Sequence, residues 1–252
     1  MNKFRAIENI FRGPEPHMVG DGFRVSQYLP VGIGDIKRLS PFILLDYHAP
    51  HYYEPSSIRR GVGAHPHRGF ETVTISYEGS VEHHDNKGNH GIIGPGDVQW
   101  MTAASGILHK EYHEKEFSES GGILHMIQLW VNLPKSEKMS EPKYQTLLKE
   151  NMGAFKLDNN QGKVSIIAGE FNGIKGPAST FTNINIYNIN LKNYGKTILK
   201  EPGNFNTGIL VLKGEVKIMK IIHVKKQILL YLTTLMVTFQ SNQLLKNLYL
   251  LY

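Results

Sequence analysis

Short apolar segments separated by turn residues run through most of this 252-residue chain, and they restrict it to a β-rich fold. The 25 glycines and 12 prolines supply many breaks, and no long stretch repeats apolar residues at helical spacing. Chains of this kind fold as β-sandwiches or barrels. The length allows one large domain or two modest ones, each with its own core.

The predicted strands of the first half are rich in β-branched and aromatic residues and are bounded by turn signals. They cover residues 23–29, 42–45, 70–77, 98–101, 107–113 and 123–131. Strong turns fall at 85–88 (Asp-Asn-Lys-Gly) and 94–97 (Gly-Pro-Gly-Asp). We therefore predict an all-β N-terminal domain over residues 1–134.

The second half repeats this pattern after a polar interruption. Residues 135–150 are predicted to form a linker, since charged residues and Pro142 break the pattern, with a short helix near 144–149. A second strand series follows at 164–168, 181–191, 197–200 and 207–217. Residues 183–190 alternate Asn with Ile or Tyr, which is typical of a strand with one wet face. These segments predict a second β domain over residues 151–218.

Residues 219–252 form an atypical tail. After Glu215 the chain contains no Asp, Glu, Gly or Pro, the residue types with which a barrel usually turns. The mostly apolar stretch at 228–239 is too short to span a bilayer. We expect the tail to pack poorly, so that ending the chain near Lys217 costs little.

Charge and cysteine content exclude several classes of protein. Of the 28 basic residues, five lysines lie after residue 215, which leaves 23 basic against 22 acidic side chains in the rest. This nearly neutral body argues against direct nucleic-acid binding. The chain has no cysteine, so a metal must be held by His, Asp or Glu. The charged residues 1–13 do not form a secretory signal, and we expect a cytoplasmic protein without membrane contact.

Two pairs of polar residues predict a metal site in the N-terminal domain. His65 and His67 are two residues apart, as are His109 and Glu111. Alternate side chains of a strand share a face, so each pair can point at one ion. Three imidazoles and one carboxylate suit iron, nickel, copper, zinc or manganese better than calcium. We predict one divalent transition metal per chain, most simply iron.

The other histidines are given structural roles. His83, His84 and His90 flank a polar turn and are predicted to be solvent-exposed. His113 shares a strand face with Glu111, so it is a candidate for supporting the ligands without touching the metal. His125 sits in an apolar run and is predicted to be a hydrogen-bonded core residue.

Long motifs in this region resemble the pirin family, two-barrel members of the cupin superfamily. They are HPHRGFETVTISYEG, GDVQWMTAASGILHKE and QLWVNLP, and the resemblance extends over roughly residues 23–217. It implies two tandem cupin-type, jelly-roll-like barrels and metal ligands at His65, His67, His109 and Glu111. Glu71, four residues after His67, is implied to support the site rather than to bind the metal.

The resemblance also implies that the second barrel is incomplete, because the sequence departs from the family near residue 219. A change of reading frame in the coding sequence would explain the loss of acidic, Gly and Pro residues. A genuine divergent helix is the alternative.

The resemblance leaves three functions open. Some bacterial pirins resemble flavonol (quercetin) 2,3-dioxygenases, which implies a small aromatic substrate, O2 and a catalytic base at Glu111. Nuclear pirins resemble iron-dependent transcriptional co-regulators, and a bacterial counterpart could bind a metabolic enzyme. In the third case the metal is only structural. Fold analogy does not choose among them.

Overall fold

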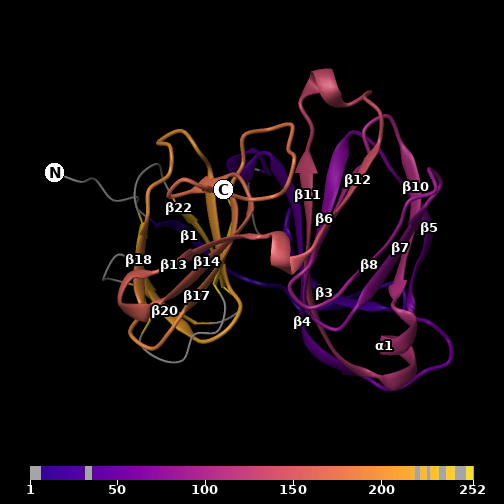
Figure 1. Ribbon diagram of the computed structural model, residues 1–252, viewed down its shortest axis with the longest axis horizontal. Coiled ribbons are helices and arrows are strands. Elements are labelled where there is room, and N and C mark those ends of the chain that lie inside the picture. The colour runs from indigo at the N-terminus through magenta and orange to yellow at the C-terminus, as the bar shows by residue number, and fades with distance from the viewer. Residues whose placement is uncertain are drawn as a thin grey trace. The chain divides into compact units, whose positions relative to one another are not determined.

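The computed structural model describes residues 7–31, 36–218, 222–225, 228–232, 237–241 and 248–251, with two compact units formed largely by the two halves of the chain (Figure 1). One unit comprises Pro14–Asn151, and the other combines Met152–Tyr252 with Met1–Gly13. Almost all regular structure is β. The helical segments are α1 (Lys115–Ser120) and four short 3-10 turns at Ile36–Leu39, Lys135–Glu137, Lys149–Asn151 and Asp158–Asn160. No helix in these ranges is long and apolar enough to cross a bilayer.

Two sheets face each other in the N-terminal unit, as Figure 1 shows. The seven-stranded sheet runs in the order β12 (Lys143–Leu147), β9 (Val98–Thr102), β6 (Phe70–Glu78), β11 (Gly122–Asn132), β4 (Phe42–Tyr53), β3 (Phe23–Leu29) and β2 (His17–Val19). The four-stranded sheet runs β5 (Gly61–His67), β10 (Ile107–His113), β7 (Val81–Asp85) and β8 (His90–Ile93). Side chains between the sheets are buried, including an apolar cluster around Phe23, Val81, Ile93 and Leu124. Each such side chain contributes about 1.5–3 kcal/mol through burial.

The turns of this unit form where the sequence predicts them. The Asp85 carboxylate accepts hydrogen bonds from the backbone N–H groups of Lys87 and Asn89, and it closes the β7–β8 hairpin with Gly88 at φ 86°. Asp97 accepts from the Gly94 N–H in the turn before β9. These local contacts fix the ends of the strands that carry the inward-facing side chains.

The predicted helix near residues 144–149 is wrong. Residues Lys143–Leu147 form β12, which pairs antiparallel with β9 and belongs to the N-terminal unit. The edge of β9 offers unpaired N–H and C=O groups, and their pairing with β12 outweighs the local helix signal. The segment predicted to be a linker therefore supplies a strand of the first barrel.

The C-terminal unit has a similar two-sheet arrangement. Its seven-stranded sheet runs β1 (Ile7–Arg12), β22 (Ile228–Leu232), β19 (Thr207–Val211), β24 (Leu248–Leu251), β17 (Ile186–Leu191), β14 (Gly162–Ala168) and β13 (Gly153–Lys156). Its four-stranded sheet runs β18 (Lys196–Leu199), β23 (Val237–Ser241), β20 (Glu215–Ile218) and β21 (Ile222–Lys225). A small hairpin joins β15 (Glu170–Phe171) to β16 (Ile174–Lys175). The predicted strand 181–191 is shorter than expected, and 207–217 is split at Gly214, whose φ is 81°.

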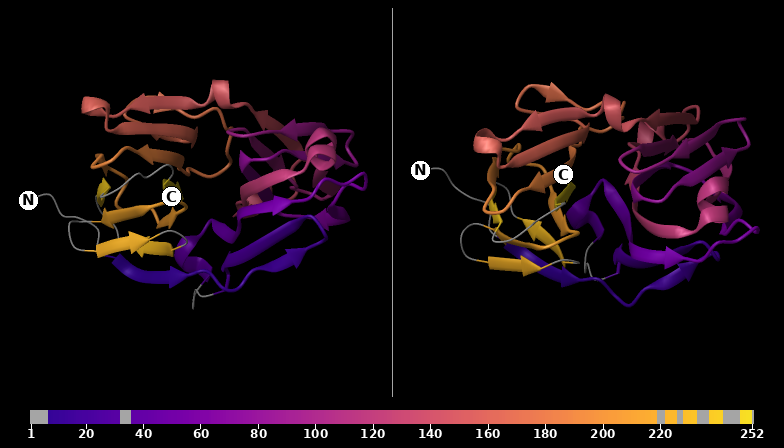
Figure 2. Two further views of the ribbon diagram at one scale, coloured as in Figure 1. Left: turned by 90° about the horizontal axis from the view of Figure 1, so that it is seen from below. Right: turned by 60° about the horizontal axis from the view of Figure 1, so that its bottom comes forward.

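The first and last parts of the chain differ from their predicted roles. Strand β1, assigned by sequence to the first domain, pairs with β22 in the C-terminal unit. The described parts of the tail form four strands, none of them helical, and Figure 2 shows the yellow tail strands beside the orange strands of this unit. Short runs such as Ile-Leu-Leu-Tyr-Leu have the length and residue types of buried strands, which overrides the argument from missing acidic residues. The residues between these strands lie outside the described ones.

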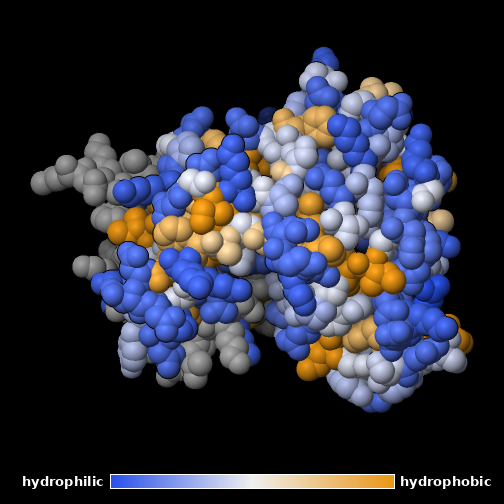
Figure 3. All heavy atoms as spheres, in the orientation of Figure 1, coloured by the Kyte–Doolittle hydropathy of each residue, from blue (hydrophilic) through white to orange (hydrophobic). Residues whose placement is uncertain are grey.

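The face seen in Figure 3 is largely hydrophilic, with hydrophobic residues in scattered groups. The apolar residues of the C-terminal unit instead gather in a core that includes Val164, Ile189, Ile209 and Val216. Each unit therefore has the buried interior and polar exterior of an independent β domain.

Candidate metal centre

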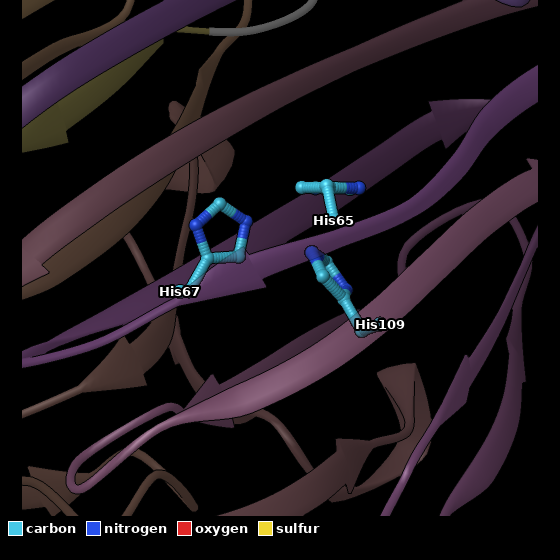
Figure 4. A group of neighbouring side chains, drawn as sticks. All are labelled: His65, His67 and His109. Atoms are coloured by element: carbon cyan, nitrogen blue, oxygen red, sulfur yellow. The ribbon is translucent and has the colours of Figure 1, made fainter.

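Strands β5 and β10 bring three of the four predicted ligands together. They pair antiparallel with His109 opposite His65, and β5 places His67 two residues further along. The three rings converge in Figure 4, and one nitrogen of each lies within 4.8 Å of the others. The ring centroids of His65 and His67 lie 4.3 and 4.7 Å from that of His109. The spacing-two argument from sequence thus places these imidazoles correctly.

Glu111 lies on the same inward face of β10 but belongs to an overlapping group. Its carboxylate groups with His109 and His83, each offering one ligand atom within 4.8 Å of the others. A bulge between His109 and Glu111 shifts the register against β5, so that Glu111 pairs with Val62. The bulge re-aims the carboxylate relative to the three-histidine cluster.

Two glutamines, the buried Gln99 and the half-buried Gln128, hold the Glu111 carboxylate. Gln99 Nε2 donates to Oε1 at 3.0 Å, and Gln128 Nε2 donates to Oε2 at 3.0 Å. Thr74 Oγ1 lies 3.5 Å from Oε1. Only 4% of Glu111 is exposed. Each carboxylate oxygen has two lone pairs, so these bonds orient Glu111 and leave acceptor capacity for a cation.

The inner histidines are kept uncharged. Burial lowers the pKa of His67 to about 3, and a positive charge on His109 or His65 would lower it further. Burial likewise lowers the pKa of His109 to about 3, with smaller effects from His65 and His83. A neutral imidazole is the form that binds a metal ion. The pair is therefore ready to bind a metal throughout the physiological pH range.

Two observations fit a cation at this cluster. His109 Nε2 is buried and has no hydrogen-bond partner, an arrangement that is costly unless a ligand satisfies the atom. His65 Nδ1 donates to the Gly63 carbonyl at 2.8 Å, which leaves its Nε2 lone pair free. Imidazole and carboxylate donors are those of transition-metal sites.

The prediction that His83 is solvent-exposed is wrong. The residue is completely buried, and its ring centroid lies 5.1 Å from that of His109. The signal was present in the sequence, because His83 and Asp85 repeat the spacing of two that marks the ligand pairs. Gln99, Gln128 and Tyr144 were also missed. Glutamines inside apolar runs are the available clue for two of them.

His84 and His90 lie on the opposite face of the hairpin. Both donate through Nε2 to Glu82 Oε1, at 2.6 and 3.1 Å, and Arg59 pairs with the other oxygen of Glu82. The prediction of exposure is confirmed for His90, whereas His84 is half-buried. The Glu82 carboxylate already has three donors, so this outer group needs no ion to satisfy it.

The remaining candidates play supporting parts in the fold. Glu71 accepts from Thr102 Oγ1 at 2.7 Å, and burial raises its pKa. His113 donates to the Gly22 carbonyl at 2.8 Å and packs against Tyr53, so it does not support Glu111. His125 is buried beside Tyr47, whose hydroxyl lies 3.2 Å from Nε2, as predicted for a core histidine.

The comparisons with known proteins agree with this architecture. The family model described as Pirin matches residues 22–131. A Pseudomonas aeruginosa protein named "Putative quercetin 2,3-dioxygenase PA2418" is 47% identical over 213 residues, which cover 83% of this chain and 73% of that protein. Pirin-1 of Arabidopsis thaliana is 38% identical over 181 residues, covering 72% of this chain and 58% of its own length. The chain thus spans less than two thirds of this plant relative.

A solved structure supports the same family and fold. The crystal structure of a quercetin 2,3-dioxygenase from Acinetobacter baumannii superimposes with a TM-score of 0.93 at 38% identity, covering 99% of this chain and 87% of that one. This likeness confirms the predicted fold of two cupin-type barrels. With 47% identity over most of both chains in the Pseudomonas relative, the protein belongs to the pirin family.

Proposed function

We propose that this protein is a metal-dependent dioxygenase acting on flavonol-like substrates, with iron held by His65, His67, His109 and Glu111. The observation that carries the proposal is the convergence of three buried or half-buried imidazoles, one of which has a buried nitrogen without a partner. The names of the Pseudomonas and Acinetobacter relatives supply the substrate class.

The residues present would hold the ion from two adjacent strands. His65 and His67 would bind it from β5, and His109 and Glu111 from β10. When bound, the ion would lower the pKa of a coordinated substrate hydroxyl and leave about two positions for substrate or water. Nickel, copper, zinc and manganese suit the same donors, and we choose iron as the simplest assignment.

Glu111 is proposed to accept the proton of the flavonol 3-hydroxyl. It is the only carboxylate among the four proposed ligands, and Gln99 and Gln128 keep its two oxygens in place. Burial of the site excludes bulk water, so a proton can pass directly between the substrate oxygen and Oε1 or Oε2.

An aromatic wall beside the cluster supports a planar substrate. Trp130 stacks on Phe70 with ring centroids 4.5 Å apart, and it lies 5.1 Å from the His67 ring. Trp130 Nε1 is buried without a hydrogen-bond partner, so a substrate oxygen could accept from it. Aromatic faces of this kind pack well against a flavonol ring system.

Oxygen consumption with quercetin tests the proposal. Wild type and Glu111→Gln are compared at matched iron loading, since Gln keeps the size and a coordinating oxygen but loses the basicity. We expect the variant to lose about 100-fold in turnover, as removal of a general base does. Equal rates would remove Glu111 as the base.

Failure of the wild type would overturn the enzymatic assignment. If the iron-loaded protein consumes no oxygen with several flavonols, the alternative of an iron-dependent regulatory module with a protein partner becomes the better account.

A further inference from the structure

A buried carboxylate–imidazole pair lies next to His109 of the three-histidine cluster. The side chains of His83 and Asp85 are both fully buried, and His83 Nε2 lies 3.2 Å from Asp85 Oδ2. Asp85 also accepts from the backbone N–H groups of Lys87 and Asn89 and from Asn89 Nδ2. These donors stabilise its charged form, and they lower the pKa of the carboxyl. A carboxylate can only accept, so His83 Nε2 must carry the proton of this contact.

The opposite end of the network leads to the same assignment. Glu111 Oε1 is also an acceptor, so the Gln99 amide must present Nε2 to it, at 3.0 Å. The Gln99 oxygen then faces Tyr144, whose hydroxyl donates to it at 3.3 Å. In this orientation Gln99 Nε2 also lies 3.3 Å from His83 Nδ1. An amide N–H facing His83 Nδ1 requires a lone pair on that nitrogen.

The proton of His109 follows from these two constraints. His83 Nδ1 lies 3.2 Å from His109 Nδ1, so a hydrogen on His109 Nδ1 lets this nitrogen share the single His83 lone pair with the slightly more distant Gln99 Nε2. His109 then carries its hydrogen on Nδ1 and a lone pair on Nε2, the buried atom without a partner. The opposite tautomer would set two lone pairs against each other and bury an N–H group with no acceptor.

We propose that Asp85 and His83 act as positioning residues that fix the tautomer of His109 and thereby aim its Nε2 lone pair at the metal. In this arrangement His109 Nδ1 donates to His83 Nδ1, and His83 Nε2 donates to Asp85. Tyr144 holds the His83 ring in place, since the two rings stack with their centroids 4.7 Å apart and their planes inclined by 24°. This inference rests on the proposed metal site, but it makes a claim about the metal-free protein as well.

Nitrogen NMR of the metal-free wild type is the first test. Long-range ¹H–¹⁵N correlation spectra distinguish the two tautomers of a histidine ring. We expect His109 as the Nδ1–H form and His83 as the Nε2–H form. Observation of His109 as the Nε2–H form would overturn the proposal, whatever the protein does with oxygen or flavonols.

Metal affinity in variants is the second test, with Ni²⁺ alone as the probe in competition with a chelator. His83→Phe keeps a ring stacked on Tyr144 but removes the acceptor, and we expect 10–100-fold weaker binding, the usual loss when a partner of a ligand is removed. His83→Asn places Oδ1 near the former Nδ1 and should restore most of the affinity.

His84→Asn is the matched control, because His84 is the next residue of β7 and faces outward. It should bind Ni²⁺ as the wild type does. A His83→Phe protein that folds and binds Ni²⁺ with wild-type affinity would overturn the positioning role. If His83→Phe does not fold, the NMR assignment of the metal-free wild type decides the matter. No Ni²⁺ binding by wild type would contradict the proposed metal site and with it the positioning role, even if the NMR tautomers are as expected.

Discussion

At the residue scale, the inner histidines make the metal-free protein sensitive to acid. In the unfolded chain a histidine binds a proton near pH 6.5, whereas burial lowers the pKa of His67 and His109 to about 3 in the folded state. Between these values the unfolded state binds more protons, so folding stability falls as the pH falls. Each histidine contributes about 1.4 kcal/mol per pH unit in that window.

The variant His67→Asn isolates this effect. Between about pH 6 and pH 4.5 the metal-free wild type should lose about 2 kcal/mol more of its unfolding free energy than the variant does. Urea unfolding of both proteins at the two pH values measures the difference. Equal losses would show that His67 already takes up its proton in the folded protein at this pH.

The sequence predicted the clustering of the proposed ligands better than it predicted their surroundings. A spacing of two places His65 and His67 on one face of a strand wherever that strand lies in the fold. Their shared orientation is therefore determined by the local sequence. Which face of β7 points inward is decided by contacts with Gln99 and Tyr144, which lie on other strands. The two-residue spacing of His83 and Asp85 matches that of the proposed ligand pairs, but the sequence of the hairpin does not show which of its faces is buried.

At the element scale, the site depends on the close approach of β5 to β10. A Cβ atom added at Gly61 would lie 2.2 Å from the Glu111 backbone oxygen and 2.7 Å from the Tyr112 Cα, distances that the backbone must widen to accept. Gly63, two residues along the same strand, has no atom within 4 Å of such a Cβ. The two glycines offer a matched pair of substitutions.

Gly61→Ala should push the two strands apart and destabilise the protein by about 1–3 kcal/mol, the usual cost of overpacking. It should also weaken metal binding, because His65 and His109 move apart with the strands. Gly63→Ala should change neither property appreciably. Urea midpoints and Ni²⁺ affinity measure both, and a stable Gly61→Ala protein with normal affinity would contradict the predicted clash.

Individual strands were predicted well where their signal is local. Strand β10 matches its predicted bounds, and β6 and β9 differ by one residue. The helix predicted near residues 144–149 failed because pairing with β9 is a contact across more than forty residues. Periodicity within one segment carries no information about such a partner.

At the scale of the whole molecule, the described tail strands belong to both sheets of the second barrel. Strand β19 is buried, and both of its neighbours in the sheet, β22 and β24, come from the tail. Strand β23 likewise lies between β18 and β20. The sequence predicted none of these pairings, because strand pairing partners cannot be recognised from composition.

A chain ending at Lys217 should therefore be severely affected, contrary to the expectation from sequence. It leaves the buried β19 without a pairing partner on either side, which exposes strand edges and favours aggregation. We expect loss of the cooperative unfolding transition of the C-terminal unit and lower solubility. Circular dichroism and sedimentation of the truncated and full-length proteins test this, and an unchanged urea midpoint would contradict it.

The central claim is that the N-terminal barrel holds one transition-metal ion per chain through His65, His67 and His109, with Glu111 beside them. The most direct measurement is the metal content of purified wild type and of the double variant His65→Ala/His109→Ala, reconstituted with Fe²⁺ under identical conditions. Removing two of the three clustered imidazoles should abolish stoichiometric binding. The account predicts about one ion per wild-type chain and almost none in the variant. Full occupancy in the double variant, or no bound ion in the wild type, would contradict it.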